Sequence, residues 1–424
     1  MNEIIHENKI AAFTEGLEKT VLPLPTSLVE QAERVLLSTD FPTTRQEAWK
    51  YTRVGRIASI YAKKKNGIIT ALPAEFTIDD NAITVVFENG KLITDLSTAS
   101  YTAGLTIKPL SLCNASELRT IGKNVQLDAE PFNALNTLYM NDGLYIQIAE
   151  NAQIDRTIQI IHVTTGIETV SNIRHVIHSG KFSKASVIQG YFTSNAESSF
   201  TNVVTEVDVC DNAHLTIDKI QYEKEGNFHI ATEQVEQAKD SHFTINTLTL
   251  NGTLVRNNLN IKVHGVNCET HLNGAYLLKD NQHVDNHTTV DHSAPHCASN
   301  ELYKGVIDGK ATAVFNGKVF VRKDSQKINA FQSNANVLLS ENATVNSKPE
   351  LEIYADDVKC SHGSTTGQLD EEAVFYLRAR GISERSARQL MVSAFIGDVL
   401  EKIENEQVLN FTHRILKDRF GWDF

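Results

Sequence analysis

Between Leu144 and Cys360 the chain carries a weak internal repeat that restricts the folds it can adopt. Short runs of β-forming residues alternate with Asn, Gly, Asp and Ser, and no long helical stripe interrupts them. A polar residue followed by Ala or Ser begins six of these runs, with the small residue at positions 152, 185, 213, 241, 311 and 343. Four of the five gaps measure 28 to 33 residues, and the gap of 70 is long enough for two units. A strand-only unit of this length is typical of a solenoid whose coils cover each other's apolar edges.

A large β-sandwich is the alternative fold for this segment. A sandwich predicts alternating apolar and polar residues, with turn signals every ~8–12 residues. Runs such as 157–161 and 247–250 instead carry β-forming residues on both faces. We therefore predict a mainly β chain, built as a right-handed parallel β-helix (β-solenoid) that is flanked by N-terminal and C-terminal helical domains, which cap its two ends.

Helical patterns on both sides of the β-rich segment set the expected domain boundaries. We predict an N-terminal helical domain over residues 1–70 and a mixed α/β connecting region over 71–143. The β-helix core follows over 144–366, and a C-terminal helical domain over 367–424. Asp370 is suited to begin a helix and Gly381 to end it. Before the core, we expect a hairpin turn at Asn89-Gly90 and helices over about residues 7–19, after Pro25, from Thr43 and after Pro131.

Composition and charge exclude several classes of protein. The 424 residues carry a formal net charge of −12, which argues against nucleic-acid binding because phosphate neutralisation needs clustered Lys and Arg. No apolar run is long enough to span a membrane, and the first six residues lack the order of a signal peptide. The five cysteines are far apart and form no CxxC pair, which fits a reducing compartment. We therefore expect a cytoplasmic protein that binds neither nucleic acid nor a membrane.

The chain lacks the motifs of common nucleotide-dependent and hydrolytic enzymes. The Gly-Lys pairs at 309–310 and 317–318 have neither the following Ser or Thr nor the upstream glycine of a phosphate-binding loop. GxSxG, HExxH and GxGxxG patterns are also absent from the sequence. We expect a chain that is not an enzyme, and we assign any ATP-driven step to another protein.

Four histidines near the middle of the β-rich segment form the densest group of possible metal ligands. They are His283, His287, His292 and His296, with Cys297 beside the last. Their spacing differs from that of zinc fingers, and the stretch has no paired cysteines. Polar residues on solenoid turns explain the group better than a closed zinc site does, and a supporting role at an interface stays open.

The motif Cys360-Ser361-His362 is the second group of candidate ligands. On an extended strand, residues i and i+2 point to the same face, so the thiol and the imidazole project together. Thiolate is a soft ligand and imidazole a borderline one, which suits zinc, copper or iron–sulfur chemistry. Two ligands do not complete a metal site, so the others must come from elsewhere. The alternative is a buried core thiol beside a hydrogen-bonded histidine at the end of a strand.

The sequence around this motif is similar to that of a known family. Residues 348–363 resemble the signature of the SufD family, the scaffold subunits of the SUF iron–sulfur cluster assembly complex. The resemblance touches most of the chain and is densest from Asp285 to Ile382. The related SufB family shares the fold, but its corresponding segment differs from the Lys-Cys-Ser-His-Gly found here. Further matching segments lie at 45–52, 133–136, 142–143, 291–297, 303–305, 315–319, 326–327, 329–330 and 375–382.

This resemblance implies a non-catalytic scaffold subunit with two protein partners. Its β-helix would pair edge to edge with SufB, and its C-terminal helices would bind the SufC ATPase. In isolation the chain is also compatible with a homodimer. The expected SufC-docking residues are Phe375, Tyr376, Arg380, Met391 and Phe395.

The resemblance also implies a role for the candidate ligand pair. His362 would be a metal ligand shared with the partner subunit at the cluster-assembly interface, and Cys360 would be its neighbour in the same motif. A transient iron–sulfur cluster would form at the SufB interface, where a cysteine and a glutamate of SufB complete the ligand set. We expect no cofactor bound by the chain alone, and we leave open whether the complex binds a flavin. Whether Cys360 ligates the cluster, relays sulfur or only shapes the strand also stays open.

Two functions from other classes compete with the scaffold. A self-contained zinc-binding β-helix protein would use the histidines between 283 and 297. A β-helix carbohydrate-active enzyme would need carboxylates clustered along a groove, and the sequence offers only scattered pairs such as Asp356-Asp357.

Overall fold

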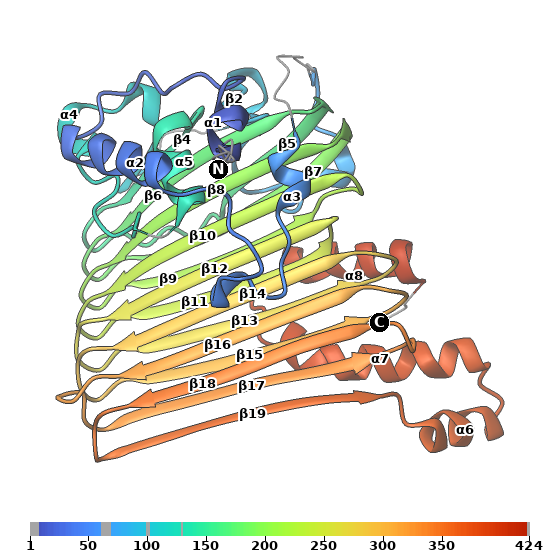
Figure 1. Cartoon of the computed structure of the whole chain (residues 1–424). Helices are drawn as coiled ribbons and strands as arrows, with labels where there is room; N and C mark the ends of the chain where they lie inside the picture. Colours follow the sequence, from blue (N-terminus) through green and yellow to red (C-terminus); the bar gives the residue numbers. More distant parts are fainter. Residues whose placement is uncertain (1–7, 61–68, 99–101, 129, 422–424) are drawn as a thin grey trace, which may run out of the picture.

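A computed structural model describes residues 8–60, 69–98, 102–128 and 130–421, and it contains a parallel β-solenoid of about eight turns (Figure 1). Each turn contributes one strand to each of two sheets, and all neighbouring strands from β4 onward pair in parallel. The predicted solenoid is therefore confirmed. The antiparallel β-sandwich is wrong for this chain, because successive strands alternate between the sheets instead of forming hairpins.

From β4 onward, odd-numbered strands belong to the ten-stranded sheet and even-numbered strands to the nine-stranded sheet. β1 and β2 also belong to the ten-stranded sheet, and β3 to the nine-stranded one. The ten-stranded sheet comprises β1 (Ile83–Glu88), β2 (Lys91–Leu92), β5 (Ile158–Ile167), β7 (Lys184–Glu197), β9 (His214–Tyr222), β11 (His242–Asn251), β13 (Glu269–Leu278), β15 (Ala298–Ile307), β17 (Ile328–Leu338) and β19 (Val358–Gln368). The nine-stranded sheet comprises β3 (Leu105–Pro109), β4 (Asp142–Ile148), β6 (Val170–Ser179), β8 (Ser199–Val209), β10 (Asn227–Gln237), β12 (Leu254–Val263), β14 (His283–His292), β16 (Thr312–Val321) and β18 (Thr344–Ile353).

Part of the weak sequence repeat, including Ala213 and Ser241, corresponds to one corner of the solenoid, whereas Ala185 lies inside β7. Before four strands of the ten-stranded sheet, a residue with left-handed φ precedes a small buried residue; the pairs are Asn212-Ala213, Asp240-Ser241, Asn267-Cys268 and His296-Cys297. Asn and Asp tolerate this φ better than most residues, and a small side chain fits the corner. The carbonyls of these small residues accept the first hydrogen bonds of the next turn. Cys268 and Cys297 therefore occupy this corner in the two turns that lie within the 70-residue gap of the sequence repeat. Ala311 and Ala343 instead mark a corner that precedes strands of the other sheet.

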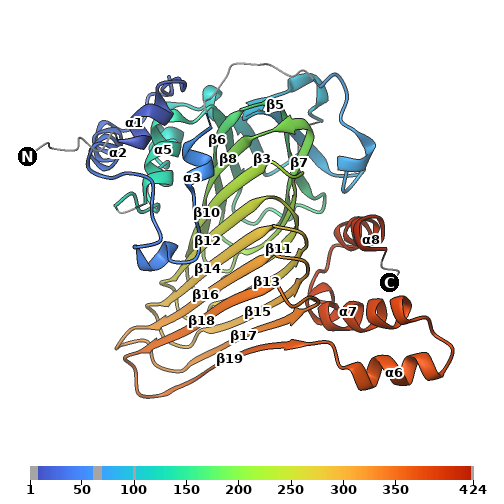
Figure 2. The ribbon, with the colours of Figure 1, turned by 45° about the vertical axis from the view of Figure 1, so that its right-hand side comes forward.

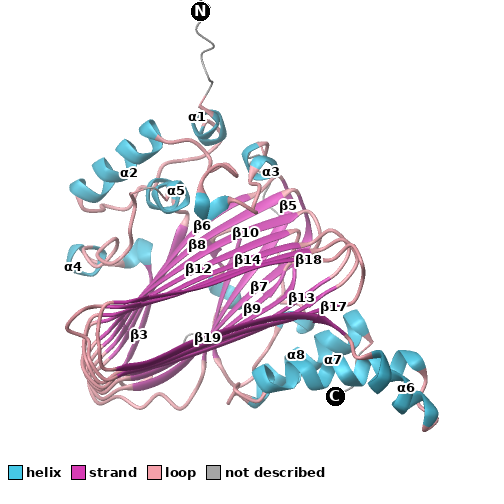
Figure 3. Cartoon of the chain, turned by 60° about the horizontal axis from the view of Figure 1, so that its bottom comes forward, coloured by secondary structure: helices cyan, strands magenta, loops and turns pink. Residues whose placement is uncertain are grey.

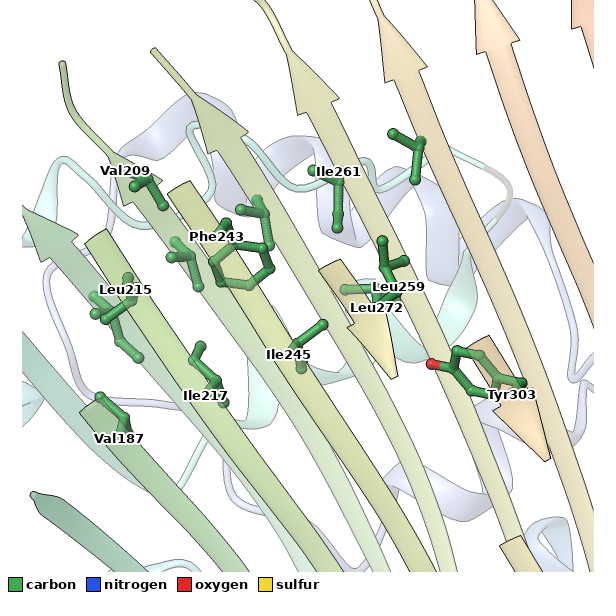
Figure 4. Packing of buried hydrophobic residues seen from close by; sticks show 14 of the residues in the cluster. Val187, Val209, Leu215, Ile217, Phe243, Ile245, Leu259, Ile261, Leu272 and Tyr303 are labelled. Atoms are coloured by element: carbon green, nitrogen blue, oxygen red, sulfur yellow. The ribbon is translucent and has the colours of Figure 1, made fainter. Parts of the chain in front are cut away.

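The main core fills the space between the two sheets. Figure 4 shows aliphatic side chains from both sheets converging there, including Val209 and Leu259 from the nine-stranded sheet and Ile245 and Leu272 from the ten-stranded sheet. In-register stacking places Ile217, Ile245 and Leu272 in one row across three successive turns. Full burial of such a side chain contributes about 1.5–3 kcal/mol. The early and middle turns are therefore stabilised mainly by apolar contacts.

The N-terminal helices cover the outer face of the nine-stranded sheet (Figures 2 and 3). The predicted helices after Pro25 and after Pro131 are present, and the one predicted over about residues 7–19 is shorter, since it ends at Thr14. The helix predicted from Thr43 is wrong, because the chain forms only a 3₁₀ turn around Trp49, whose indole packs into the helical cluster. The elements on this face are α1 (Lys9–Thr14), α2 (Thr26–Ser38), η1 (Glu47–Trp49), α3 (Gly55–Ala58), η4 (Leu110–Leu112), α4 (Ala115–Leu118) and α5 (Pro131–Tyr139). Two further short turns, η2 (Ala74–Phe76) and η3 (Thr94–Leu96), pack against the outer face of the ten-stranded sheet.

The C-terminal helices are α6 (Glu371–Ala379), α7 (Glu384–Leu400) and α8 (Glu406–Phe420). Asp370 accepts the N-terminal N–H groups of α6, as its sequence position predicts, and Gly381 adopts φ 91° after it. Helix α7 packs against β13 and β15, on the outer face of the ten-stranded sheet. The prediction that these helices cap the end of the solenoid is therefore wrong, since they lie along its side and leave β18 and β19 uncovered (Figures 1 and 3).

No helix in the described ranges has the length and apolar character needed to cross a membrane. The first six residues, on which the expectation about a signal peptide depends, lie outside the described residues.

A buried ion pair attaches the N-terminal segment to the solenoid. The Arg256 guanidinium on β12 lies 2.5 Å from Asp285 Oδ2 on β14, and it stacks 3.7 Å from the ring centroid of Trp49. Thr52 Oγ1 donates to the same carboxylate oxygen at 2.5 Å. Burial alone would raise the pKa of Asp285, but Arg256 and His287 outweigh that effect and hold the pKa well below its usual range. The carboxylate is therefore ionised and holds three parts of the chain together.

We predict that Asp285→Ala lowers the free energy of unfolding by about 3–5 kcal/mol, because Arg256 then stays buried without a counter-charge. Denaturant unfolding measures this change. Asp291→Ala is the matched control: Asp291 pairs with Arg322, whose side chain is 55% exposed, so its removal costs less than about 1 kcal/mol. Equal losses in the two variants would contradict the proposed importance of the buried pair.

Candidate functional site

Cys360 and His362 lie on β19, the strand that ends the ten-stranded sheet. Cys360 pairs with Ala330 of β17, and His362 pairs with Gln332. Ala330 belongs to the core between the sheets and Cys360 packs against that core, so this row faces inward. Residue i+2 shares the face, which directs His362 inward as well. The structure thus brings both candidate ligands to the same face, at the open end of the solenoid.

The two side chains differ in exposure and in readiness to bind metal. Cys360 is half-buried, and desolvation by burial raises the pKa of its thiol. A thiol must lose its proton to act as a ligand, so this environment disfavours binding by Cys360. His362 is exposed because no further turn covers it. The geometry therefore makes His362 the more accessible ligand of the pair.

The last turn also presents unpaired strand edges. β18 and β19 each pair with one neighbour only, β16 and β17 respectively, and stand at the ends of their sheets. Their free N–H and C=O groups can pair with a strand of another chain. Tyr354, at the end of β18, is 59% exposed and contacts the Phe320 ring. An interface at this end can therefore combine backbone pairing with apolar contact.

A short row of polar side chains continues inward from His362. Gln332 lies in the preceding turn and Glu301 in the one before, directly in register. Gln332 Nε2 donates to Glu301 Oε2 at 2.7 Å, and Thr288 Oγ1 donates to Glu301 Oε1 at 2.5 Å. Burial raises the pKa of Glu301 to about 7, although both hydrogen bonds favour the ionised form. This row replaces the apolar row of the earlier turns and ends at the candidate site.

More of the late solenoid interior is polar, a feature that no pattern in the sequence predicts. Tyr276 donates to Asn336 Oδ1 at 2.5 Å, and Asn334 links Tyr276 to Ser347. Ser347 in turn contacts Ser364 of the last turn at 2.8 Å. Alternation along single strands is a weak signal for these positions, because their inward direction becomes visible only when the strands are in register.

The four histidines between 283 and 296 do not converge. His283 contacts Thr52 at 2.8 Å and His287 contacts Asp285 at 2.9 Å, both on the outer face of β14 beside the N-terminal segment. His292 faces inward and contacts Ser299 at 2.9 Å, while His296 occupies a left-handed corner with φ 62°. Within the described ranges, no group of three or more His, Cys, Asp or Glu residues is placed to hold a metal ion. These contacts favour the structural interpretation over the self-contained zinc site.

The outer face of the ten-stranded sheet carries a cavity of about 820 Å³. Its lining includes His271, Phe331 and Ser361, and reaches the turn after α7 at Lys402. Glu301 and Glu404 are the two carboxylates among the lining residues, and Glu301 is directed into the core. Paired carboxylates across a groove, which glycoside hydrolysis requires, do not line this cavity.

The five residues predicted for docking fall into two groups. Phe375 and Tyr376 on α6 are 69% and 56% exposed, and Arg380 stacks on the Tyr376 ring at 4.4 Å. Met391 and Phe395 on α7 are half-buried against the cluster that joins the helices to the ten-stranded sheet. The α6 residues are therefore the accessible ones, and the α7 pair has a packing role. The structure adds Leu390 of α7, whose side chain is 53% exposed, to the accessible apolar residues of these helices.

Comparison with known proteins gives matches along almost the whole chain. A family model described as SUF system FeS cluster assembly, SufBD core domain, matches residues 162–395, and one described as SufBD protein N-terminal region matches residues 11–160. The chain is 29% identical over 382 residues to the iron–sulfur cluster assembly protein SufD of Escherichia coli (strain K12), covering 89% of each chain. It is 31% identical over 412 residues to an iron–sulfur cluster assembly SufBD family protein of Synechocystis, covering 93% of this chain and 90% of the relative. It is 29% identical to the chloroplastic protein ABCI7 of Arabidopsis thaliana, covering 94% and 88%.

We predict that Glu301→Gln flattens the pH dependence of stability. The unfolded carboxyl has a pKa near 4.5 and the folded one about 7, so the native state retains the proton over this range. The stability associated with this group is present below pH 4.5 and is lost as pH rises through about 7, a change of about 3 kcal/mol. Urea unfolding at pH 5 and pH 8 should show that loss in the unchanged chain and a smaller one in Glu301→Gln. Glu404→Gln makes the same change at an exposed carboxylate, and a pH slope in Glu301→Gln as steep as that of this control would contradict the prediction.

Proposed function

The chain belongs to the SufBD family of the SUF iron–sulfur cluster assembly system, and from this membership we propose that it serves as a non-catalytic scaffold subunit of the SufD type. The observation that carries the proposal is the exposed imidazole of His362 on the last solenoid turn, beyond which no described strand pairs. A scaffold for a cluster that must be released needs ligands that are accessible and easily exchanged. A neutral imidazole at an open edge meets both needs.

The incomplete ligand set supports assembly with a second subunit. This chain offers His362 and, more weakly, Cys360 at the open end, so an iron–sulfur cluster needs further ligands from a partner. We propose that SufB adds its own β-helix edge to β18 and β19 and contributes the missing cysteine and glutamate. The cluster is then a transient product held between the subunits, in agreement with the sequence-based expectation that this chain binds no cofactor alone.

A separate surface suits the ATPase. Phe375, Tyr376 and Leu390 expose apolar side chains on the C-terminal helices, and Arg380 lies beside them. Aromatic residues and Arg are frequent centres of protein interfaces. We propose that SufC docks on this α6–α7 surface and supplies ATP hydrolysis, for which the sequence of this chain has no phosphate-binding loop.

We predict that His362→Ala lowers cluster formation by at least about tenfold without unfolding the chain, because the exposed side chain contributes to ligation more than to packing. The measurement is the activity of an iron–sulfur enzyme in cells that depend on this assembly system, with thermal unfolding of the purified variant as the test of folding. Ser361→Ala is the matched control, since Ser361 lies on the same strand but on the opposite face. Normal enzyme activity in His362→Ala cells would remove the proposed role.

We predict that the double change Phe375→Ser and Tyr376→Ser weakens co-purification with SufC by tenfold or more, because both side chains are exposed and available to a partner. Circular dichroism should show unchanged helix content. Leu37→Ser is the matched control, because Leu37 is also a highly exposed apolar residue but lies on α2 at the opposite sheet. Undiminished SufC recovery with the double variant would show that docking occurs elsewhere.

A further inference from the structure

Glu301, Gln332 and His362 occupy one inward-facing row in three successive turns of the solenoid. Neighbouring strands lie about 4.8 Å apart, so side chains in such a row contact one another directly. Glu301 and Gln332 are only 5% and 3% exposed, whereas His362 stands at the open end. The row thus connects a buried carboxyl group to the exposed imidazole.

The hydrogen bonds of Gln332 leave one of its atoms unused. Its amide nitrogen donates to Glu301 Oε2 at 2.7 Å, which turns the amide oxygen away from Glu301. Among the described residues, this oxygen is buried and has no hydrogen-bond partner. A buried carbonyl oxygen without a donor is unfavourable, and native structures rarely tolerate one. His362, in the next turn of the same row, is the neighbour placed to supply that donor.

We propose that Gln332 is a positioning residue for His362, accepting one ring N–H of the imidazole through its amide oxygen while Glu301 holds the amide in that orientation. A neutral imidazole carries one donor nitrogen and one acceptor nitrogen. Once the donor is bound to Gln332, the acceptor nitrogen is free to bind metal at the open end of the solenoid. Metal-binding histidines are commonly oriented in this way by a hydrogen bond from their second ring nitrogen. The contact between Gln332 and His362 does not depend on the proposed function. The inference rests on that function only where it takes the bound metal to be that of an iron–sulfur cluster.

A glycine on the facing sheet makes room for this arrangement. A Cβ atom at Gly317 would lie 2.2 Å from Gln332 Nε2 and 2.8 Å from the Phe315 ring. The glycine therefore permits the amide to reach across the interior to Glu301. At Gly363, beside His362, a Cβ atom would meet nothing within 4 Å. Gly317→Ala therefore displaces the Gln332 side chain without changing its chemical groups. Gly363→Ala is the control, because the added Cβ atom displaces nothing.

The test reads the imidazole directly in the isolated full-length chain. Long-range ¹H–¹⁵N spectra of protein labelled at its histidine ring nitrogens distinguish the two neutral tautomers, and the loss of one signal set in His362→Asn assigns His362. We expect a single tautomer in the unchanged chain and a mixture in Gln332→Leu, which has similar volume but no acceptor. Cluster formation in cells should fall about 10- to 100-fold in Gln332→Leu. An unchanged His362 tautomer in a folded Gln332→Leu protein would overturn the inference.

Substitutions at Glu301 and Gly317 separate positioning from general damage. Glu301→Gln retains an oxygen that can accept from Gln332 and should preserve the single tautomer, whereas Glu301→Leu should produce the mixture. Gly317→Ala should also produce the mixture, and Gly363→Ala should not. The same mixture in Gly363→Ala would count against the inference, because that change does not touch the row.

The two proposals can fail independently. If His362→Asn leaves cluster formation intact while Gln332→Leu still changes the tautomer, the positioning contact is supported and the ligand role is lost. If His362→Asn abolishes cluster formation while Gln332→Leu alters neither the tautomer nor assembly, the ligand role stands and the positioning contact is overturned.

Discussion

The hydrogen-bond ladder between successive turns is the constraint on which the rest of the structure depends. From β5 to β17 every strand has a parallel neighbour on each side, so each turn satisfies the backbone of the next. The last turn has a neighbour on one side only. Because α7 packs on the side of the ten-stranded sheet, the C-terminal helices leave this turn uncovered. The geometry that builds the core therefore also creates the accessible edge on which Cys360 and His362 lie.

Polar residues inside the late turns give this edge a chemical character. Apolar side chains fill the row in the middle of the solenoid, and the row then changes to Glu301, Gln332 and His362. Burying these groups costs free energy unless they are hydrogen-bonded, so the observed contacts require one register of the strands. A slip of a single residue would direct Glu301 to solvent and break its bonds with Gln332 and Thr288. The same contacts that specify the register thus bring an ordered polar row up to the proposed assembly site.

A local sequence pattern predicts the structure correctly where it carries the physical cause. The small residue after a left-handed Asn or Asp marks a corner, and Asp370 begins a helix because its side chain accepts the first N–H groups. A local pattern is insufficient where contacts between distant residues decide the structure. The segment after Thr43 has a helical pattern, yet it forms only a 3₁₀ turn, in which Trp49 stacks against Arg256 of the solenoid. The interior role of Gln332 was missed for the same reason, since its partners are in other turns.

The sequence by itself determined that a solenoid forms, that helices flank it and that a thiol and an imidazole share a strand face, because repeat length, helix caps and strand alternation are local properties. Tertiary structure alone decided that the last turn is left open, that Met391 and Phe395 are half-buried while Phe375 is exposed, and that the histidines near 283 do not meet. These outcomes depend on which surfaces pack together. Packing is settled by burial and register over the whole fold, and no short segment of the chain contains that information.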